Sequence, residues 1–219
     1  SLFQQAVERV NQLGAADIAV GKTLVVTNEE HRFLSLEQLR EIKGVNATLL
    51  LEPTGRNTAP ALTLAALQAT EDGQDPILVV TPADQTVQNP IAFQQALQQS
   101  IRVAATGSIV ILGITPDKPE TGYGYIQQSG AAGAHGEYAV AQFAEKPSLE
   151  IAKAYLAGGQ HTWNSGMFVL RASTWLKALQ HFRPDIATAT QKAWQGKTID
   201  TPFVRPNKQA FTQVPSESV

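Results

Sequence analysis

Hydrophobic and polar positions follow two different periods along this chain. Short unbroken apolar runs predict buried strands, at residues 22–27, 47–52, 76–81 and 108–114. Segments in which apolar residues recur at three- and four-residue steps predict helices, over 2–13, 28–42, 59–70 and 90–104. Buried strands that alternate with helices are typical of a mainly parallel sheet covered on both faces. The first half of the chain therefore predicts an α/β fold.

The second half has a different pattern. Two strands within 123–130 and 139–147 are joined by a loop rich in glycine and alanine, which predicts a hairpin. A strand is expected after it, at 166–172, and helices are expected at 148–157, 173–182 and 184–194. No change in composition marks a linker, so we predict a single domain over residues 1–219. The chain begins inside a helical pattern and stops after a polar turn, so we expect this domain to be partial, truncated at both ends.

Helix caps are a weaker signal than periodicity. No residue ahead of the first helical pattern is expected to act as a cap. Within the helical pattern 28–42, Ser35 and Gln38 have the spacing of a capping box.

Composition excludes several classes of protein. Seventeen basic residues balance nineteen acidic ones in 219 residues, for a net charge of -2, which argues against binding nucleic acid through a broad basic surface. The absence of cysteine excludes disulfides, a thiolate nucleophile and a cysteine zinc site. No apolar run approaches 18 residues and no basic-then-apolar leader is present, so we expect no membrane partner and a cytoplasmic localisation.

Candidate chemistry lies where the predicted strands end, because ligands bind beyond the carboxyl ends of strands in an open parallel sheet. The turn from Glu52 to Pro60 is unusually specific for a connector. Asn57 or Thr58 can cap the next helix, and Gly55 permits a positive backbone angle or a close approach by a ligand. Capping does not account for Arg56 or for the Glu52-Pro53 pair, and polar groups here can read the edge of a base.

Four further motifs have both an ordinary and a functional interpretation. Asp84, in "TPAD", can hold Mg²⁺ or simply cap a turn. Gly122 and Gly124 flank Tyr123, which suits either a close ligand or a kinked strand entrance. The Glu145-Lys146 pair can bind hydroxyls and a phosphate, or remain solvated. In "WNSGMF", a core tryptophan beside a turn is the simpler interpretation.

Other signals fail on spacing or context. The glycines of "GAAGAHG" join two strands and do not have the spacing of a phosphate loop, so we interpret this segment as a flexible hairpin loop. There is no Walker sequence and no G-x-S-x-G elbow. The histidines lack metal-ligand spacing, at positions His31, His135, His161 and His181.

Taken together, five motifs in order are much more specific than any one of them. "EPTGRNTAPA", "TPADQ", "PETGYGYI", "FAEKP" and "WNSGMF" resemble the mannose-1-phosphate guanylyltransferases, closest to the bacterial type that is often fused to a phosphomannose isomerase domain. The resemblance covers nearly the whole chain. It implies a Rossmann-like nucleotidyltransferase fold and the synthesis of GDP-mannose and pyrophosphate from GTP and mannose 1-phosphate. It also implies Mg²⁺ as the cofactor.

The resemblance also implies residue roles, carried over position by position. It places the nucleotide at the 52–59 turn, with Asn57 and Thr58 nearest the guanine, and the implied nucleotide-binding residues are Glu52, Pro53, Gly55, Arg56, Asn57 and Thr58. Asp84 is the implied metal ligand, and with Lys146, which would hold the sugar phosphate, it forms the implied catalytic set. The implied sugar-binding residues are Gly122, Tyr123, Gly124, Glu145, Asn164 and Gly166.

Three departures from the family pattern bear on activity. The family's glycine-rich phosphate-binding signature and a second metal-binding aspartate, expected after "PSES", are absent from these 219 residues. We therefore expect little or no turnover from this chain alone. Gln85 stands where the family commonly has histidine.

Alternatives remain open at this stage. The chain could be another sugar-nucleotide pyrophosphorylase that uses UTP or dTTP with glucose 1-phosphate, or a non-catalytic regulatory domain that binds sugar nucleotides. A dinucleotide-dependent dehydrogenase fits the fold but lacks the glycine fingerprint. The oligomeric state, with a homodimer among the options, and the polysaccharide or glycoconjugate that the product would feed are not encoded in any motif.

Overall fold

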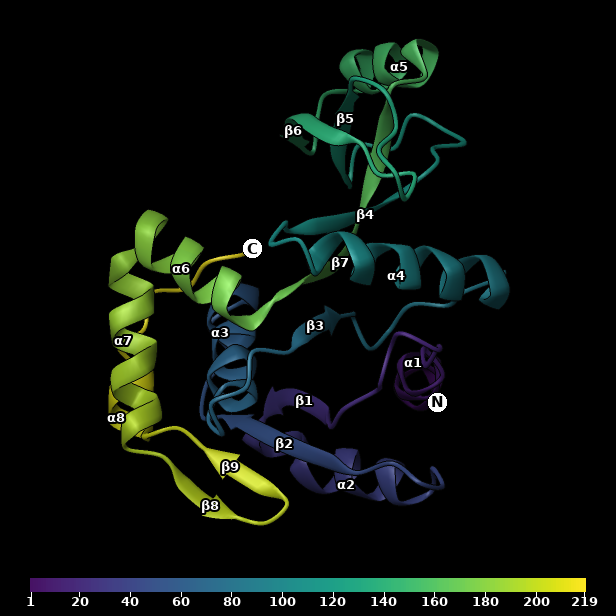
Figure 1. Ribbon diagram of the computed structural model, residues 1–219. Coiled ribbons are helices and arrows are strands. Elements are labelled where there is room, and N and C mark those ends of the chain that lie inside the picture. The colour runs from purple at the N-terminus through teal and green to yellow at the C-terminus, as the bar shows by residue number, and fades with distance from the viewer.

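The computed structural model describes all 219 residues (Figure 1). The strands are β1 (Thr23–Asn28), β2 (Ala47–Glu52), β3 (Ile77–Val80), β4 (Val110–Ile114), β5 (Gly124–Ser129), β6 (Ala139–Glu145), β7 (His161–Arg171), β8 (Thr198–Asp200) and β9 (Phe203–Arg205). The helices are α1 (Leu2–Asn11), the 3₁₀ helix η1 (Glu29–His31), α2 (Arg32–Arg40), α3 (Thr58–Ala69), α4 (Pro90–Ala104), α5 (Leu149–Gly158), α6 (Ala172–Phe182), α7 (Pro184–Gln195) and α8 (Lys208–Phe211).

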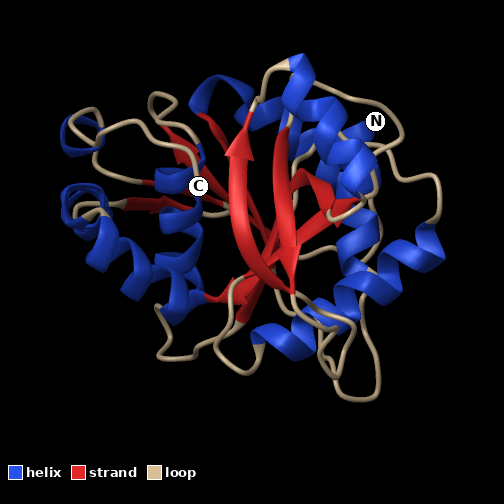
Figure 2. Cartoon of the chain, turned by 90° about the horizontal axis from the view of Figure 1, so that it is seen from above, coloured by secondary structure: helices blue, strands red, loops and turns tan.

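The strands form two sheets, with helices on both sides of them (Figure 2). One sheet has the order β1-β2-β9-β8, and the other has the order β3-β7-β5-β6 with β4 also paired to β7. The predicted α/β class, with mixed sheets flanked by helices, is confirmed. The expected dominance of parallel pairs is not met: β1–β2 and β2–β9 are parallel, and all other ladders are antiparallel. A strand covered on both faces has the same apolar pattern whether its neighbours are parallel or antiparallel. Periodicity therefore could not distinguish the two kinds of pairing.

The second sheet is organised around β7, which pairs along both of its edges. Along one edge, β4 pairs with the part of β7 between Trp163 and Val169. The other edge is divided, because β5 pairs with residues 161–163 and β3 pairs with residues 168–171. The stretch Asn164–Met167, here called the β7 gap, has no ladder partner on this second edge. The strand expected at 166–172 is therefore longer, and the "WNSG" motif lies inside it rather than ahead of it.

The main core lies between β2, β7 and the helices α3, α6 and α7. Leu50 and Leu170 contribute from the sheets, and Leu64 and Ile186 from the helices, all with no exposed surface. Trp175 is also buried here, and its indole N–H donates a hydrogen bond to Thr63 Oγ1 over 3.0 Å. The polar edge of a large aromatic residue is thus satisfied inside an apolar cluster.

The first helix has a cap, contrary to the prediction. Ser1 and Gln4 form a capping box at the start of α1. The box expected at Ser35 and Gln38 is absent, because Ser35 lies inside α2 after the η1 turn has already begun the helical segment. Gln38 instead accepts a hydrogen bond from the Ser1 hydroxyl, and so joins α2 to the start of α1.

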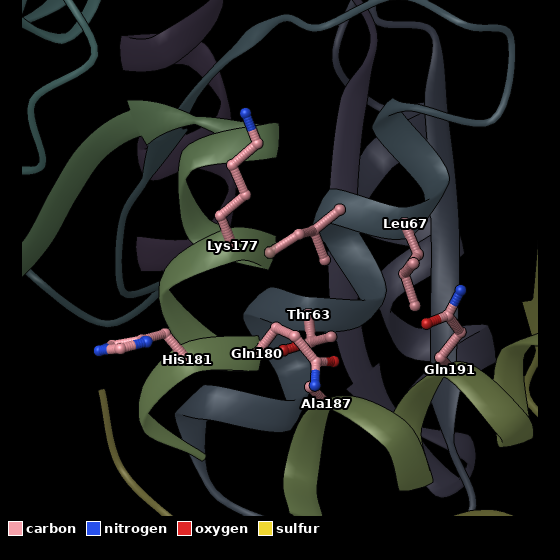
Figure 3. Close-up of a pocket in the computed structure, with 8 residues that line it drawn as sticks. Thr63, Leu67, Lys177, Gln180, His181, Ala187 and Gln191 are labelled. Carbon is pink, nitrogen blue, oxygen red and sulfur yellow. The ribbon is translucent and has the colours of Figure 1, made fainter. Parts of the chain in front are cut away.

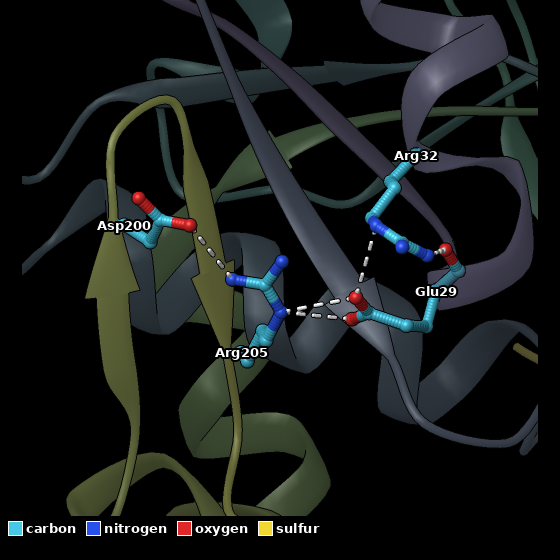
Figure 4. A network of polar contacts seen from close by, with 4 residues as sticks. All are labelled: Glu29, Arg32, Asp200 and Arg205. Carbon is cyan, nitrogen blue, oxygen red and sulfur yellow. Dashed lines mark hydrogen bonds and ion pairs between the residues drawn. The ribbon is translucent and has the colours of Figure 1, made fainter.

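The hairpin β8–β9 and the short helix α8 were not predicted. β9 adds a third parallel strand beside β2, and Arg205 at its end is held by Glu29, Nε to Oε2 over 3.0 Å (Figure 4). Glu29 follows β1, so this ion pair crosses the end of β2. Asp200 and Arg32 extend the same network. Three-residue strands give no readable period, which is why the sequence did not indicate them.

No helix of this chain combines the length and the apolar character that crossing a membrane requires.

Thr63 provides a test of the core hydrogen bond. Its hydroxyl accepts from Trp175 and donates to the Ala59 carbonyl over 2.7 Å. Thr63→Val leaves the buried indole N–H unpaired, so we expect the free energy of unfolding to fall by about 1–3 kcal/mol. Thr70→Val is the matched control in urea denaturation, because Thr70 also donates back along α3, to Ala66, but accepts nothing. Equal losses in the two variants would contradict the role of Thr63.

Candidate functional site

Four of the five sequence motifs meet around β7, the strands paired with it, and β6 on the far side of β5. Asn164 lies opposite Gly113 on β4, and Trp163 lies opposite Tyr125 on β5. The Tyr123 and Trp163 rings pack edge to face with centroids 5.3 Å apart. The "GYG" and "WNSG" motifs, forty residues apart in sequence, are therefore neighbours, as their predicted common role requires.

The β7 gap is closed by side chains rather than by a strand. Gln85 Nε2 donates to the Ser165 carbonyl over 2.8 Å, and Asn164 Oδ1 accepts from the Gly166 amide over 3.0 Å. Gly166 has φ +71°, and a Cβ there would lie 3.7 Å from Pro82 Cγ. The "TPADQ" turn is thus fixed against the "WNSG" turn.

Gln85, which departs from the family pattern, now has a structural account. Its side chain bonds to β7, and its carbonyl accepts from Arg9 Nη2 on α1 over 2.8 Å. Asp84, the predicted metal ligand, directly precedes it. The sequence singled out the position but gave no reason for it, because both partners are distant along the chain.

The predicted sugar-binding residues on β5 and β6 face each other. Gly124 pairs with Glu145, and the Lys146 amide donates to the Tyr123 carbonyl over 3.2 Å. A Cβ on Gly124 would lie 2.7 Å from Glu145 Oε2 and 2.8 Å from Phe143 Cζ. A side chain at position 124 would therefore displace the ends of the Glu145 and Phe143 side chains, whereas a Cβ at Gly122 would meet only Glu120, at 3.6 Å.

Glu145 and Lys146 are both exposed, and they form an ion pair, Nζ to Oε1 over 3.6 Å. Such a surface pair stabilises the fold little, so both groups are available to a ligand. Lys146 has φ +46°, and the other non-glycine residue with positive φ is Asn57, at +67°. Both lie in predicted binding motifs, and residues held in this sparsely populated region cluster at functional sites.

Trp163 adds a group that the sequence analysis did not assign. Its side chain is buried, and its indole N–H has no hydrogen-bond partner. A buried donor without a partner is rare in folded proteins. The motif drew attention to the aromatic ring, but only the fold shows that its N–H is unpaired beside Tyr123.

Asp84 is exposed and makes no hydrogen bond or ion pair. No group of three or more His, Asp or Glu residues in the chain could by itself hold a metal ion. A single carboxylate still fits Mg²⁺, because this ion is usually bound through one or two carboxylates together with substrate phosphates and water. Asp84 can therefore hold a Mg²⁺ ion that arrives with phosphate, but it does not form a complete metal site.

The 52–59 turn lies on the other sheet and contacts the C-terminal segment. Asn57 Oδ1 caps α3 by accepting from the Thr58 amide over 2.9 Å, as one of the two predicted capping choices. Thr58 Oγ1 accepts from the Val219 amide over 3.0 Å, and Arg56 Nη2 donates to the Thr212 carbonyl. These three side chains, expected at the nucleotide, thus already bond to the backbone.

Two side-chain atoms of this turn are buried and have no hydrogen-bond partner, Arg56 Nε and Glu52 Oε1. Glu52 ends β2 and is 8% exposed. Burial raises the pKa of the Glu52 carboxyl to about 7, because the charged form is kept from water. Leu50 on the same face packs into the core beneath α3, and strand alternation directs Glu52 to that face.

Two cavities lie largely apart from these residues. A cavity of about 610 Å³ lies between α3, α6 and α7, and its lining includes Thr63, Leu67 and Gln191. The Lys177 ammonium and the His181 ring point away from its centre (Figure 3). A cavity of about 350 Å³ contains only Pro53 of the predicted set.

The pKa of Glu52 predicts a stability change with pH. Between pH 4.5 and 7 the folded chain binds more protons at this carboxyl than the unfolded chain, so stability is lost as pH rises. Glu52→Gln cannot ionise. We expect it to raise the free energy of unfolding at pH 8 by up to about 3 kcal/mol, and to change it little near pH 4.

Urea denaturation at the two pH values measures this difference. Glu30→Gln, an exposed position close to the end of β1, is the control and should show the same stability as the parent at both pH values. If Glu52→Gln changed the free energy of unfolding equally at pH 8 and pH 4, the raised pKa of the Glu52 carboxyl would be contradicted.

The comparisons with known proteins agree with the geometry. The chain is 48% identical over 207 residues to the xanthan biosynthesis protein XanB of Xanthomonas campestris. The aligned region covers 94% of this chain and 44% of that protein. It is 45% identical over 221 residues to a mannose-1-phosphate guanylyltransferase of Escherichia coli, covering 100% of this chain and 46% of that protein. The chain thus spans about half the length of the curated relatives it matches.

The fold is shared with a solved structure. The crystal structure of mannose-6-phosphate isomerase from Helicobacter pylori superposes with a TM-score of 0.86 at 32% identity, over 100% of this chain and 81% of that chain. Residues 1–208 match the nucleotidyl transferase family. On this match, and with the fold and the motif positions in agreement, the chain belongs to the nucleotidyl transferase family.

Proposed function

We propose that this chain is the nucleotidyl-transferring part of a mannose-1-phosphate guanylyltransferase, which makes GDP-mannose and pyrophosphate from GTP and mannose 1-phosphate. The observation that carries the proposal is the convergence of the "GYG", "EK", "WNSG" and "TPADQ" motifs around β7. The names of the Escherichia coli relative and of the xanthan biosynthesis protein support it. The name of the xanthan biosynthesis protein also supports a role in polysaccharide synthesis.

The reaction needs positioning and charge neutralisation more than covalent catalysis. A phosphate oxygen of mannose 1-phosphate attacks the α-phosphorus of GTP in line. The new oxygen–phosphorus bond forms as the bond to the β-phosphate bridge breaks, and pyrophosphate leaves with that bridging oxygen. The residues of this chain bind and orient the two substrates for this step.

The sugar phosphate has a consistent set of contacts on this surface. Lys146 is exposed at the end of β6 and can neutralise the phosphate. Glu145 beside it is exposed and can accept from sugar hydroxyls. Tyr123 and the Asn164–Gly166 turn complete the walls of this half of the site.

Asp84 is the proposed Mg²⁺ ligand, and the bound ion would supply charge stabilisation at the phosphates. Gln85 holds the Asp84 turn against the β7 gap, which keeps the proposed metal ligand next to the sugar half of the site. The proposal includes a cytoplasmic localisation, which the absence of cysteine also fits.

A thermal-shift titration tests the proposed function. A ligand that binds only the folded state raises the melting temperature by mass action. We expect GDP-mannose with Mg²⁺, at about 100 times its Kd, to raise the melting temperature by about 5–10 °C. UDP-glucose and dTDP-glucose should leave it unchanged. A shift with either of these and none with GDP-mannose would support the alternative pyrophosphorylases instead.

Lys146 provides a residue-level test. Lys146→Ala removes the positive charge proposed to face the sugar phosphate, so we expect the Kd of mannose 1-phosphate to rise by about 10-fold or more. Lys153→Ala on α5, which is also exposed, is the matched control and should bind like the parent. Isothermal titration calorimetry measures both, and an unchanged affinity in Lys146→Ala would remove Lys146 from the site.

A further inference from the structure

The segment 215–219 crosses the turn that is expected at the nucleotide. The Glu217 amide donates to the Arg56 carbonyl over 3.3 Å, and the Glu217 carbonyl accepts from the Ala59 amide over 3.0 Å. The two residues between Arg56 and Ala59, which the resemblance places nearest the guanine, are thus bracketed by Glu217. The segment lies against this turn like a short strand.

The same contacts complete the start of α3. The first amides of a helix have no acceptor within the helix. Asn57 Oδ1 accepts from the Thr58 amide. The Ala59 amide bonds to Glu217, and Pro60 has no N–H. The segment therefore supplies the acceptor that the Ala59 amide would otherwise lack.

Asn57 has a backbone conformation that needs support from its surroundings. Its φ is +67°, which residues other than glycine rarely adopt. Such a conformation persists where neighbouring contacts over-determine it. Glu217 bonds to the residue before Asn57 and to the second residue after it, so the shape of this turn depends on where the segment 215–219 lies.

The segment is tied to the helices of the main core through the Glu217 side chain. Glu217 Oε2 accepts from Arg183 Nη1. Ser216 and Ser218, on either side of Glu217, are exposed. A segment near a chain end is poorly ordered unless specific contacts hold it. The ion pair with Arg183 is such a contact, and it lies beside the backbone bonds that reach the turn.

Arg183 is itself fixed in orientation. It lies between α6 and α7, where its amide donates to the Leu179 carbonyl over 2.8 Å and its carbonyl accepts from the Ala187 amide over 3.1 Å. The Asp185 carboxylate accepts from Arg183 Nε and Nη2, over 3.0 and 2.8 Å. A guanidinium that bonds a carboxylate at two points has a defined plane, and its remaining nitrogen donates to Glu217.

We propose that Arg183 and Glu217 are positioning residues for the nucleotide half of the site. Their ion pair joins the α6–α7 corner to the segment 215–219, and that segment fixes the turn expected to carry the nucleotide. The inference rests on the proposed function and extends it to two residues that none of the five motifs contains. Both residues act by holding the turn in its binding conformation before the ligand arrives, so less ordering is needed on binding.

Hydrogen exchange followed by NMR tests the structural step. The Ala59 amide bonds to Glu217, whereas the Thr70 amide at the end of the same helix bonds to Ala66. In Arg183→Ala and in Glu217→Ala we expect exchange at Ala59 to become about threefold to fivefold faster, the upper range of what an exposed ion pair contributes. Exchange at Thr70 should not change.

Isothermal titration calorimetry with GDP and with mannose 1-phosphate tests the functional step. Each variant should bind GDP about threefold to fivefold more weakly than the parent and should bind mannose 1-phosphate equally well. The double variant should lose no more affinity for GDP than either single variant, because both substitutions break the same interaction. A general loss of structure would instead weaken the binding of both ligands.

Arg102→Ala is the matched control. Arg102 on α4 bonds Asp17 with the same two-point geometry, Nε over 2.8 Å and Nη2 over 3.0 Å. The side chains of this pair are about as exposed as those of Arg183 and Asp185. α4 packs on β3, β4 and β7 rather than on α3. The control should therefore keep the parent's exchange rate at Ala59 and the parent's affinity for GDP.

The outcomes separate the two proposals. If the parent binds GDP but Arg183→Ala and Glu217→Ala bind it equally well, or exchange at Ala59 is unchanged, the positioning role is overturned and the guanylyltransferase proposal stands. Equal weakening of both ligands, or additive losses in the double variant, would also overturn the positioning role alone. A parent that does not bind GDP would overturn both proposals for this chain.

Discussion

The backbone pairing of β7 is the constraint on which the rest of this structure depends. One strand of 11 residues holds β4 along one edge and both β5 and β3 along the other. Since β3 and β5 do not meet, the β7 gap is left between them. The gap removes a short length of ladder and replaces it with side-chain hydrogen bonds from Gln85 and Asn164. The candidate sugar site is built around this interruption.

This arrangement explains how distant motifs act as one surface. Gln85 follows β3, and its hydrogen bond to β7 fixes the turn that carries Asp84. Gly124 on β5 leaves room for the Glu145 side chain, which a Cβ would displace. Glu145 and Lys146 form a solvent-exposed ion pair, and such a pair contributes little to the stability of a fold. Using these two side chains for binding would therefore lower stability little. The positive φ of Lys146 is a further sign that local stability is not what shapes this turn.

The 52–59 turn follows a different physical rule. Here the exposed side chains of Asn57 and Thr58 bond to backbone, at the α3 cap and at Val219. Glu52 Oε1 and Arg56 Nε are buried and have no hydrogen-bond partner. The fold loses stability as the buried Glu52 carboxyl ionises. The two halves of the candidate site thus differ: Glu145 and Lys146 form an exposed charged pair, whereas Glu52 is a buried acid.

The sequence by itself determined the local features of this protein. Periodicity gave the α/β class and most helices and strands, because burial of one face leaves a readable pattern. Motifs at strand ends gave the candidate residues, because ends of buried strands place side chains at one edge. Only the tertiary structure decided the ladder directions, the β8–β9 hairpin, the partner of Gln85 and the unpaired state of Glu52 and Trp163. Each depends on atoms far apart along the chain, and a residue's own neighbours in sequence do not record which distant group, if any, satisfies it.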